Sequence, residues 1–136
     1  SCIANEIIKM GYPVLYLTAH KLFEIITYHK LIFFNNKQIQ EDELYYADMY
    51  KDIFNVELLI IDDLGTETMT SSKYSELLNI LNIRQLNSKN SPCKTIISTN
   101  LGAKELFENY SERIISRIIG NFKTFKFIGE DIRRKI

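Results

Sequence analysis

Four consecutive large aliphatic residues, Leu58–Ile61, constrain the fold more than any other stretch of this chain. They do not alternate with polar residues, as they would in a strand with one face in water. They therefore predict a strand buried on both faces, as in a parallel sheet that helices cover on both sides. Asp62 and Asp63 follow directly, with Gly65 soon after. Ligands of such sheets bind beyond the carboxyl ends of the strands, where these two carboxylates would lie.

An apolar strand that ends in acidic residues has the form of a Walker B segment. In such a segment the first acid holds Mg²⁺, usually through water, and the next polarises the water that attacks a γ-phosphate. Asp62 would take the first role and Asp63 the second. The alternative is a solvated strand end that leads into a glycine turn and binds nothing. These residues alone leave both interpretations open.

Composition narrows the class of protein. The chain has 136 residues, which suits one domain, and 46% of them are hydrophobic, which is enough for a buried core. Basic and acidic residues number 17 each, so a nucleic-acid site would have to be local. Cys2 and Cys93 form no C-x-x-C pair and no signal peptide is visible, which favours a reducing cytoplasm. No apolar run is long enough to cross a membrane, so we expect no membrane association.

Apolar periodicity predicts an alternation of helices and strands. We expect strands over 14–18, 58–61 and 94–100, and an alternating edge strand over 122–128. Helices are expected over 1–10, 19–34, 41–54, 73–87, 103–110 and 111–119, with Ser71 or Ser72 capping the fourth. This alternation predicts an α/β fold with three layers and a mostly parallel sheet. The first three strands should be parallel neighbours in chain order.

Two features of the helices are open to a functional interpretation. The aromatic residues over 41–54 could stack on bases or pack on the sheet; acidic residues in the same helix would repel phosphates, so we favour packing. His20 and His29 lie nine residues apart, a spacing that does not bring two ligands together on a helix. We interpret both histidines as structural.

Polar residues follow three of the expected elements at one edge of the sheet: the acids after 58–61, residues 98–100, and the charged tail 129–135. In this order they resemble the Walker B, sensor 1 and sensor 2 elements of the AAA+ class of P-loop NTPases. The stretches IDDLGTE, TIISTN, SERIISRI and GEDIRRK are similar to replicative helicase loaders of the DnaC and DnaI type, and to the related IstB transposition helper ATPases. The resemblance covers nearly the whole chain and implies one partial AAA+ ATPase core domain over residues 1–136.

The resemblance also implies a role for the polar residues at this edge, with ATP and Mg²⁺ as cofactors. Asp62 would coordinate the metal. Asp63 stands where most AAA+ proteins carry the catalytic glutamate, and its shorter side chain suggests slow hydrolysis. Asn100 would be sensor 1, which hydrogen-bonds the γ-phosphate or the attacking water. Its alternative role is that of a turn residue after a strand.

Arginines near the end of the chain match further elements of these ATPases. Arg113 and Arg117 lie four residues apart, on one helix face. They match the segment whose last arginine reaches a neighbouring subunit's nucleotide, which implies self-association through the Arg117 face. Arg133 matches the sensor 2 position, with Arg134 as its substitute. The alternative for the first pair is two solvated basic residues.

The phosphate-binding motif of this class, G-x-x-x-x-G-K-[ST], does not occur in the sequence. In relatives that loop immediately precedes the helix that Ser1 opens. We therefore expect a fragment cut just after the Walker A loop, without the central strand that leads into it. Such a polypeptide is expected to be inactive by itself.

The function that the resemblance implies is that of the ATPase core of a helicase loader. Its intact parent would use ATP and Mg²⁺, assemble on single-stranded DNA and deliver a replicative DNA helicase. One alternative is the IstB-like transposase helper, and another is an adaptor that binds a helicase or DNA without hydrolysing ATP. A phosphoacceptor receiver domain would also place acids at this edge, but it accounts for neither Arg117 nor the 94–100 strand.

Overall fold

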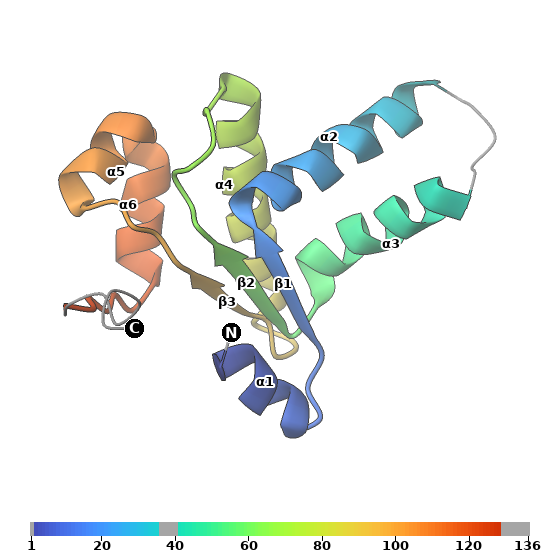
Figure 1. Ribbon diagram of the computed structural model, residues 1–136, viewed down its shortest axis with the longest axis horizontal. Helices are drawn as coiled ribbons and strands as arrows, with labels where there is room; N and C mark the ends of the chain where they lie inside the picture. The colour runs from blue at the N-terminus through green and yellow to red at the C-terminus, as the bar shows by residue number, and fades with distance from the viewer. Residues whose placement is uncertain (1, 36–40, 129–136) are drawn as a thin grey trace, which may run out of the picture.

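The computed structural model describes residues 2–35 and 41–128. These residues form a parallel sheet with helices around it (Figure 1). The strands are β1 (Val14–Thr18), β2 (Leu58–Asp62) and β3 (Lys94–Ile97). The helices are α1 (Cys2–Lys9), α2 (Ala19–Asn35), α3 (Glu41–Asn55), α4 (Ser71–Asn87), α5 (Ala103–Asn109) and α6 (Glu112–Asn121).

The sheet has the predicted order and direction. β2 lies in the middle and pairs in parallel with β1 on one side and β3 on the other. Leu59 is in register with Leu15 of β1 and with Thr95 of β3. All four aliphatic residues of β2 are buried, as their lack of alternation predicts. The expected α/β architecture is confirmed.

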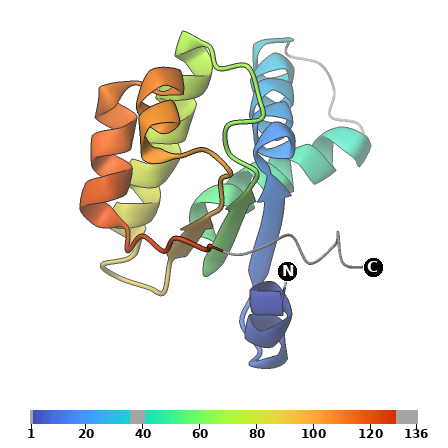
Figure 2. The same cartoon turned by 60° about the vertical axis from the view of Figure 1, so that its left-hand side comes forward.

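The two faces of the sheet carry different layers. Leu59 and Ile61 point into a core that α2, α4 and α6 share. Leu58 and Ile60 point to the other face, where Ala4 of α1 packs against them. Figure 2 shows α1 apart from the larger helical layer. Since α1 has only eight residues, it covers the sheet over a short length.

The aromatic helix α3 packs mainly against α2 and α4, and its last residues share the core that covers this face of the sheet. α2 and α3 project side by side away from the sheet (Figure 1). Ile53 and Phe54 near the end of α3 enter the core, whereas Tyr45 near its start is exposed. His29 of α2 stacks on Tyr50 of α3 with ring centroids 3.8 Å apart, and burial lowers the pKa of His29. This contact supports a structural role for His29.

The edge strand expected over 122–128 does not form. Phe125 and Phe127 in this segment are 67% and 95% exposed. Alternation shows only that one face of a segment suits burial, whereas a strand also needs a hydrogen-bonding neighbour. In the described part of the chain nothing pairs with the outer edge of β3, so the segment has no ladder to join.

Two further boundaries differ from expectation. The cap of α4 is Thr70, not Ser71 or Ser72: its hydroxyl accepts a hydrogen bond from the Lys73 amide at 3.3 Å. An N-cap residue has an extended backbone, and its side-chain oxygen accepts a hydrogen bond from an amide two or three residues ahead. Thr70 meets both conditions. β3 ends at Ile97 rather than at residue 100, although the Ser98 amide still donates to the Ile61 carbonyl of β2.

A buried arginine of α4 joins the end of α3 to the start of β3. Arg84 of α4 is 1% exposed. Its guanidinium donates to the carbonyls of Ile53 at 3.0 Å, Val56 at 2.9 Å and Lys94 at 2.7 Å, and to the Thr95 hydroxyl at 2.8 Å. The rigid fork of donors thus ties the end of α3 to the start of β3.

We predict that Arg84→Met lowers the free energy of unfolding by about 2–4 kcal/mol, because it leaves several buried carbonyls without a donor. Arg113→Met is the matched control: Arg113 is exposed and makes no hydrogen bond or ion pair within the described residues, so its change should stay below about 0.5 kcal/mol. Urea denaturation of both variants measures the difference. Equal losses would show that the buried guanidinium does not stabilise the fold.

Candidate functional site

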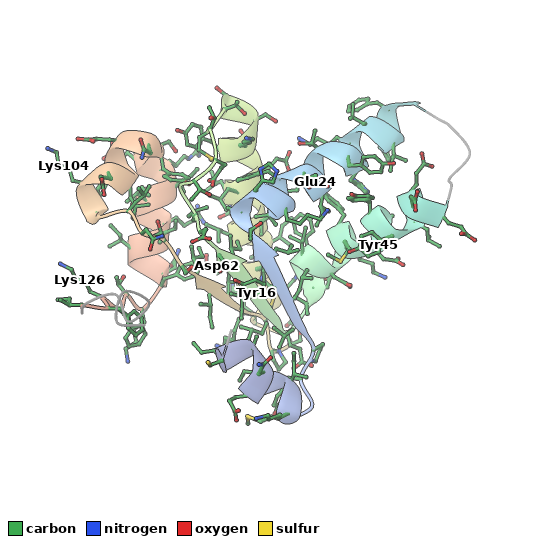
Figure 3. The ribbon with its side chains drawn as sticks, viewed as in Figure 1. Tyr16, Glu24, Tyr45, Asp62, Lys104 and Lys126 are labelled. Atoms are coloured by element: carbon green, nitrogen blue, oxygen red, sulfur yellow. The ribbon has the colours of Figure 1, made fainter. Side chains whose placement is uncertain are left out.

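The site is centred on Asp62, the last residue of the central strand. Its carboxylate accepts hydrogen bonds from the hydroxyls of Tyr16 in β1 and Ser98 after β3, and from the Asp63 amide at 3.1 Å. The Ser98 amide donates to the Ile61 carbonyl at 2.9 Å, so the ladder with β2 continues one residue past β3. Figure 3 shows Tyr16 and Asp62 together on the sheet. The three strands therefore bring one carboxylate and two hydroxyls to a single point.

These hydrogen bonds fix the protonation states of the pair. The bond from Ser98, followed by that from Tyr16, lowers the pKa of Asp62 below its ordinary value, and burial opposes them only in part. The bond to Asp62 also raises the pKa of Tyr16. Asp62 is therefore an anion at neutral pH, and Tyr16 keeps the proton that it donates.

Asp63 follows in a left-handed backbone conformation, with φ of 55°. This conformation is uncommon for residues other than glycine, although aspartate tolerates it better than most. The Asp63 amide also lies 3.3 Å from the Ser98 hydroxyl, and the next amide, that of Leu64, donates to the Ser98 carbonyl at 2.9 Å. The Asp63 carboxylate is exposed and has no hydrogen-bonding partner in the described part of the chain. It is free to contact a ligand.

The loop after Asp63 is fastened to the far side of the site. Gly65 has φ of 105°, and a Cβ there would lie 2.3 Å from Leu101. The Glu67 carboxylate accepts from the Gly65 amide at 3.2 Å and from the Tyr110 hydroxyl at 2.6 Å. Tyr110 is buried at the junction of α5 and α6, and burial raises its pKa. The acidic edge is thus connected to the start of α6 through Glu67.

The remaining predicted residues lie in two places. Asn100 is exposed and follows β3 at the same edge as Asp62, two residues beyond Ser98. Arg113 and Arg117 lie on α6, where neither forms an ion pair or hydrogen bond with a described residue. Glu108, one turn before α6, lies 3.8 Å from Lys104. Arg133 and Arg134 fall outside the described residues.

The sequence placed residues 98–100 at this edge without a role for Ser98, and it did not indicate Tyr16 or the Glu67–Tyr110 pair. Each of them acts through a partner 35 or more residues away, at a point set by strand register or helix packing. A signal existed for Ser98 alone, because parallel pairing in chain order places the residue that follows 94–97 beside Asp62.

The donor set fits a magnesium ion. Asp62, Asp63 and Ser98 offer hard oxygen ligands, which Mg²⁺ prefers. The residues at 2–35 and 41–128 contain no group of three or more His, Cys, Asp or Glu that could hold a metal. Magnesium sites of nucleotide enzymes commonly use one or two carboxylates and take their other ligands from water and phosphate. The arrangement at Asp62 has that composition.

The fold has well-matched counterparts among solved structures. A DNA replication initiation factor superposes with a TM-score of 0.61 at 22% identity, over 85% of this chain and 31% of its own. DnaA bound to AMPPCP and single-stranded DNA superposes with a TM-score of 0.63 at 21% identity, over 86% and 32%. AMPPCP-bound DnaA from Aquifex aeolicus gives the same values. The fold is that of the AAA+ class of P-loop NTPases.

The sequence is also related to known loaders. No protein-family model matches the chain. It is 29% identical to the replicative helicase loader DnaC of Escherichia coli K12 over 139 aligned positions, and equally to that of Shigella flexneri. This alignment covers the whole chain but 51% of each loader, so the chain spans about half the length of these relatives. The expected resemblance to the DnaC-type loaders is confirmed.

No helix in the described part of the structure has the length and apolar character that a membrane crossing requires.

We predict that Ser98→Ala raises the pKa of Asp62, because it removes the strongest stabiliser of the carboxylate. A depressed carboxyl pKa contributes stability above the unfolded value and loses it as the pH falls through the folded value. Ser98→Ala should therefore cost more stability at pH 7 than at pH 3.

Carbon-13 NMR of the Asp62 carboxyl measures the midpoint in both proteins, and Ser91→Ala, at an exposed serine, is the control. An unchanged midpoint in Ser98→Ala would show that the Ser98 hydroxyl does not hold the charge.

Proposed function

We propose that this chain is the AAA+ ATPase core of a DNA-replication helicase loader, one partial core domain over residues 1–136. The observation that carries the proposal is the hydrogen bond between Asp62, at the end of the central strand, and Ser98, which directly follows the neighbouring strand β3. That contact assembles an ionised carboxylate, the exposed Asp63 and the segment bearing Asn100 at one edge of a parallel sheet. Ligands of such sheets bind at this edge.

Each residue at the edge has a task in this proposal. Asp62 would hold Mg²⁺ through its carboxylate, directly or through water. The bound ion would neutralise charge on the ATP phosphates. Asp63, whose carboxylate is free of protein partners, would orient the attacking water and take its proton. Asn100 would hydrogen-bond the γ-phosphate or that water, and its exposed side chain has no competing partner in the described residues.

The arginines of α6 would act on a neighbouring subunit. Ile114 and Ile115 are buried in the core, so the opposite side of α6 faces outward. Arg113 is exposed and Arg117 is half-buried, and neither is neutralised by a carboxylate in the described residues. A guanidinium is always charged and can contact two phosphate oxygens at once, which suits it to a γ-phosphate. We assign Arg117 this role, with Arg113 at the same interface, and Arg133 or Arg134 the sensor 2 role.

The proposed partners follow from the relatives. DnaC is a replicative helicase loader, and one DnaA structure holds AMPPCP and single-stranded DNA. For this chain we propose ATP as ligand, a replicative helicase and single-stranded DNA as partners, and the cytoplasm as its location. The curated relatives reported above are loaders, which favours this function over that of a transposition helper.

A second candidate is an adaptor that binds nucleotide, helicase or DNA without hydrolysis. One observation favours it: position 63 carries the shorter aspartate. The two candidates differ in whether Asp63 has a chemical role. Substitution of the two acids separates them.

In a protein that carries a phosphate-binding loop ahead of this chain, Asp63→Asn should keep nucleotide affinity and reduce turnover by about 10²–10⁴-fold, the usual contribution of a general base. Asp62→Asn should instead weaken the Mg²⁺-dependent part of nucleotide binding. Steady-state ATPase assays and calorimetry with Mg·ATP measure the two effects. Asp48→Asn, at an exposed carboxylate of α3, is the control. Normal turnover in Asp63→Asn would favour the adaptor.

Arg117 should act in trans in the same protein. Arg117→Ala and a substitution of the phosphate-loop lysine should each abolish most ATPase activity. Mixed, the two proteins should recover part of it, because some interfaces then join an intact nucleotide site to an intact arginine. Lys89→Ala, at an exposed lysine, is the control and should be active alone.

Failure to recover on mixing, with both proteins shown to co-assemble, would contradict this role for Arg117. Full activity of the Arg117→Ala protein by itself would show that Arg117 is a solvated residue without a role in the reaction.

A further inference from the structure

Tyr16 makes an unusual contact for a residue in the first strand. Its side chain is 42% exposed, yet its hydroxyl donates to the Asp62 carboxylate (Figure 3). The strand register pairs Tyr16 with Ile60, and Asp62 with Thr18. The contact is therefore diagonal across the two strands, at a separation that only a long side chain can span.

The fold does not need this contact for packing. Tyr16 and Asp62 lie on the sheet face that α1 covers, because side chains alternate along each strand. On that face α1 packs over Leu58 and Ile60, and Tyr16 is not part of the hydrophobic cluster that they form with Ala4. The ring of Tyr16 can leave Asp62 without opening the core.

The three hydrogen-bond donors on Asp62 differ in how firmly they are held. The Ser98 hydroxyl and the Asp63 amide both donate to Oδ1. The backbone around them is held by two further bonds, from the Ser98 amide to the Ile61 carbonyl and from the Leu64 amide to the Ser98 carbonyl. The Tyr16 hydroxyl donates to the other oxygen, Oδ2, from an exposed side chain with two rotatable bonds. Oδ2 is therefore the oxygen that can be freed at least cost.

We infer that Tyr16 is a positioning residue that occupies Oδ2 of Asp62 and must release it before a divalent cation binds there. The inference rests on the proposed role of Asp62 as the metal-holding acid. The hydroxyl proton occupies the Oδ2 lone pair on the side of Tyr16 and repels a cation that approaches from that side, so direct coordination there uses the fraction of molecules in which Tyr16 has moved away. Apparent affinity falls in proportion to that fraction. Tyr16 thus lowers the affinity of the site for free metal and keeps the carboxylate oriented until the ion arrives.

The test uses this chain and Mn²⁺ alone as a paramagnetic substitute for Mg²⁺. Mn²⁺ is titrated into the protein, and broadening of amide NMR signals around Asp62 gives the dissociation constant. Tyr16→Phe keeps the ring and removes the donor, and it should bind Mn²⁺ about two- to tenfold more tightly, the range expected for loss of one exposed hydrogen bond to a carboxylate. Tyr12→Phe, at an exposed tyrosine whose hydroxyl bonds to no described residue, should match the wild type.

A second measurement follows the side chain itself. Titration with Mg²⁺ should shift the ring signals of Tyr16 and leave those of Tyr12 unchanged. Tyr16→Leu, which also lacks the hydroxyl, serves if the phenylalanine variant is poorly folded. A role in structure alone would not tighten metal binding.

The outcomes distinguish the role of Tyr16 from the metal-binding role of Asp62. Equal or weaker Mn²⁺ binding by Tyr16→Phe, at a site that Asp62→Asn abolishes, would overturn the inference and leave the metal role of Asp62 intact. Broadening that Asp62→Asn does not change, or no broadening in any of the proteins, would overturn the metal role and the inference together.

Discussion

Parallel pairing of β2 with a strand on each side is the interaction on which the rest of the structure depends. Because both edges of β2 are hydrogen-bonded and both faces are covered, Leu58–Ile61 tolerate no polar side chain. The first position where the chain can carry a charge is the end of the strand, at Asp62. The same pairing places Tyr16 and Ser98 beside that position. The candidate site is thus a direct consequence of how the central strand ends.

The sequence predicts the parts of the fold that local pattern determines. Leu58–Ile61 indicate a buried strand by themselves, and helical crossovers between strands make parallel order the expected one. Arg84 could not be predicted, because its four acceptors belong to segments that meet only after folding. The prediction of an edge strand over 122–128 was wrong for a related reason, because a strand depends on a hydrogen-bonding neighbour. Within the site, Asp62 and Asp63 were predictable as chain neighbours, whereas the Glu67–Tyr110 bond spans 43 residues.

The loop that follows β2 is held from several directions. The Leu64 carbonyl accepts from the Thr99 hydroxyl at 2.6 Å, Gly65 lies against Leu101, and Glu67 reaches Tyr110. These contacts fix the loop to the segment after β3 and to the junction before α6. A residue in this loop is therefore placed by the surrounding structure and not by its own preference. Such preorganisation suits groups that must meet a ligand in a set geometry.

Asp63 lies at the start of this loop in a left-handed backbone conformation. An L-residue in the left-handed region costs about 1–2 kcal/mol relative to glycine, which adopts it freely. The turn at Asp63 would form at lower cost with glycine, since the bonds that shape it involve the Asp63 backbone and the Asp63 side chain contacts no described partner. The Asp63 carboxylate contacts no described residue, so it does not offset the conformational cost of the turn. Backbone strain of this kind is concentrated at functional positions. For the catalytic role proposed above, this turn would hold the Asp63 carboxylate at the end of the central strand, where no described residue competes with a ligand for it.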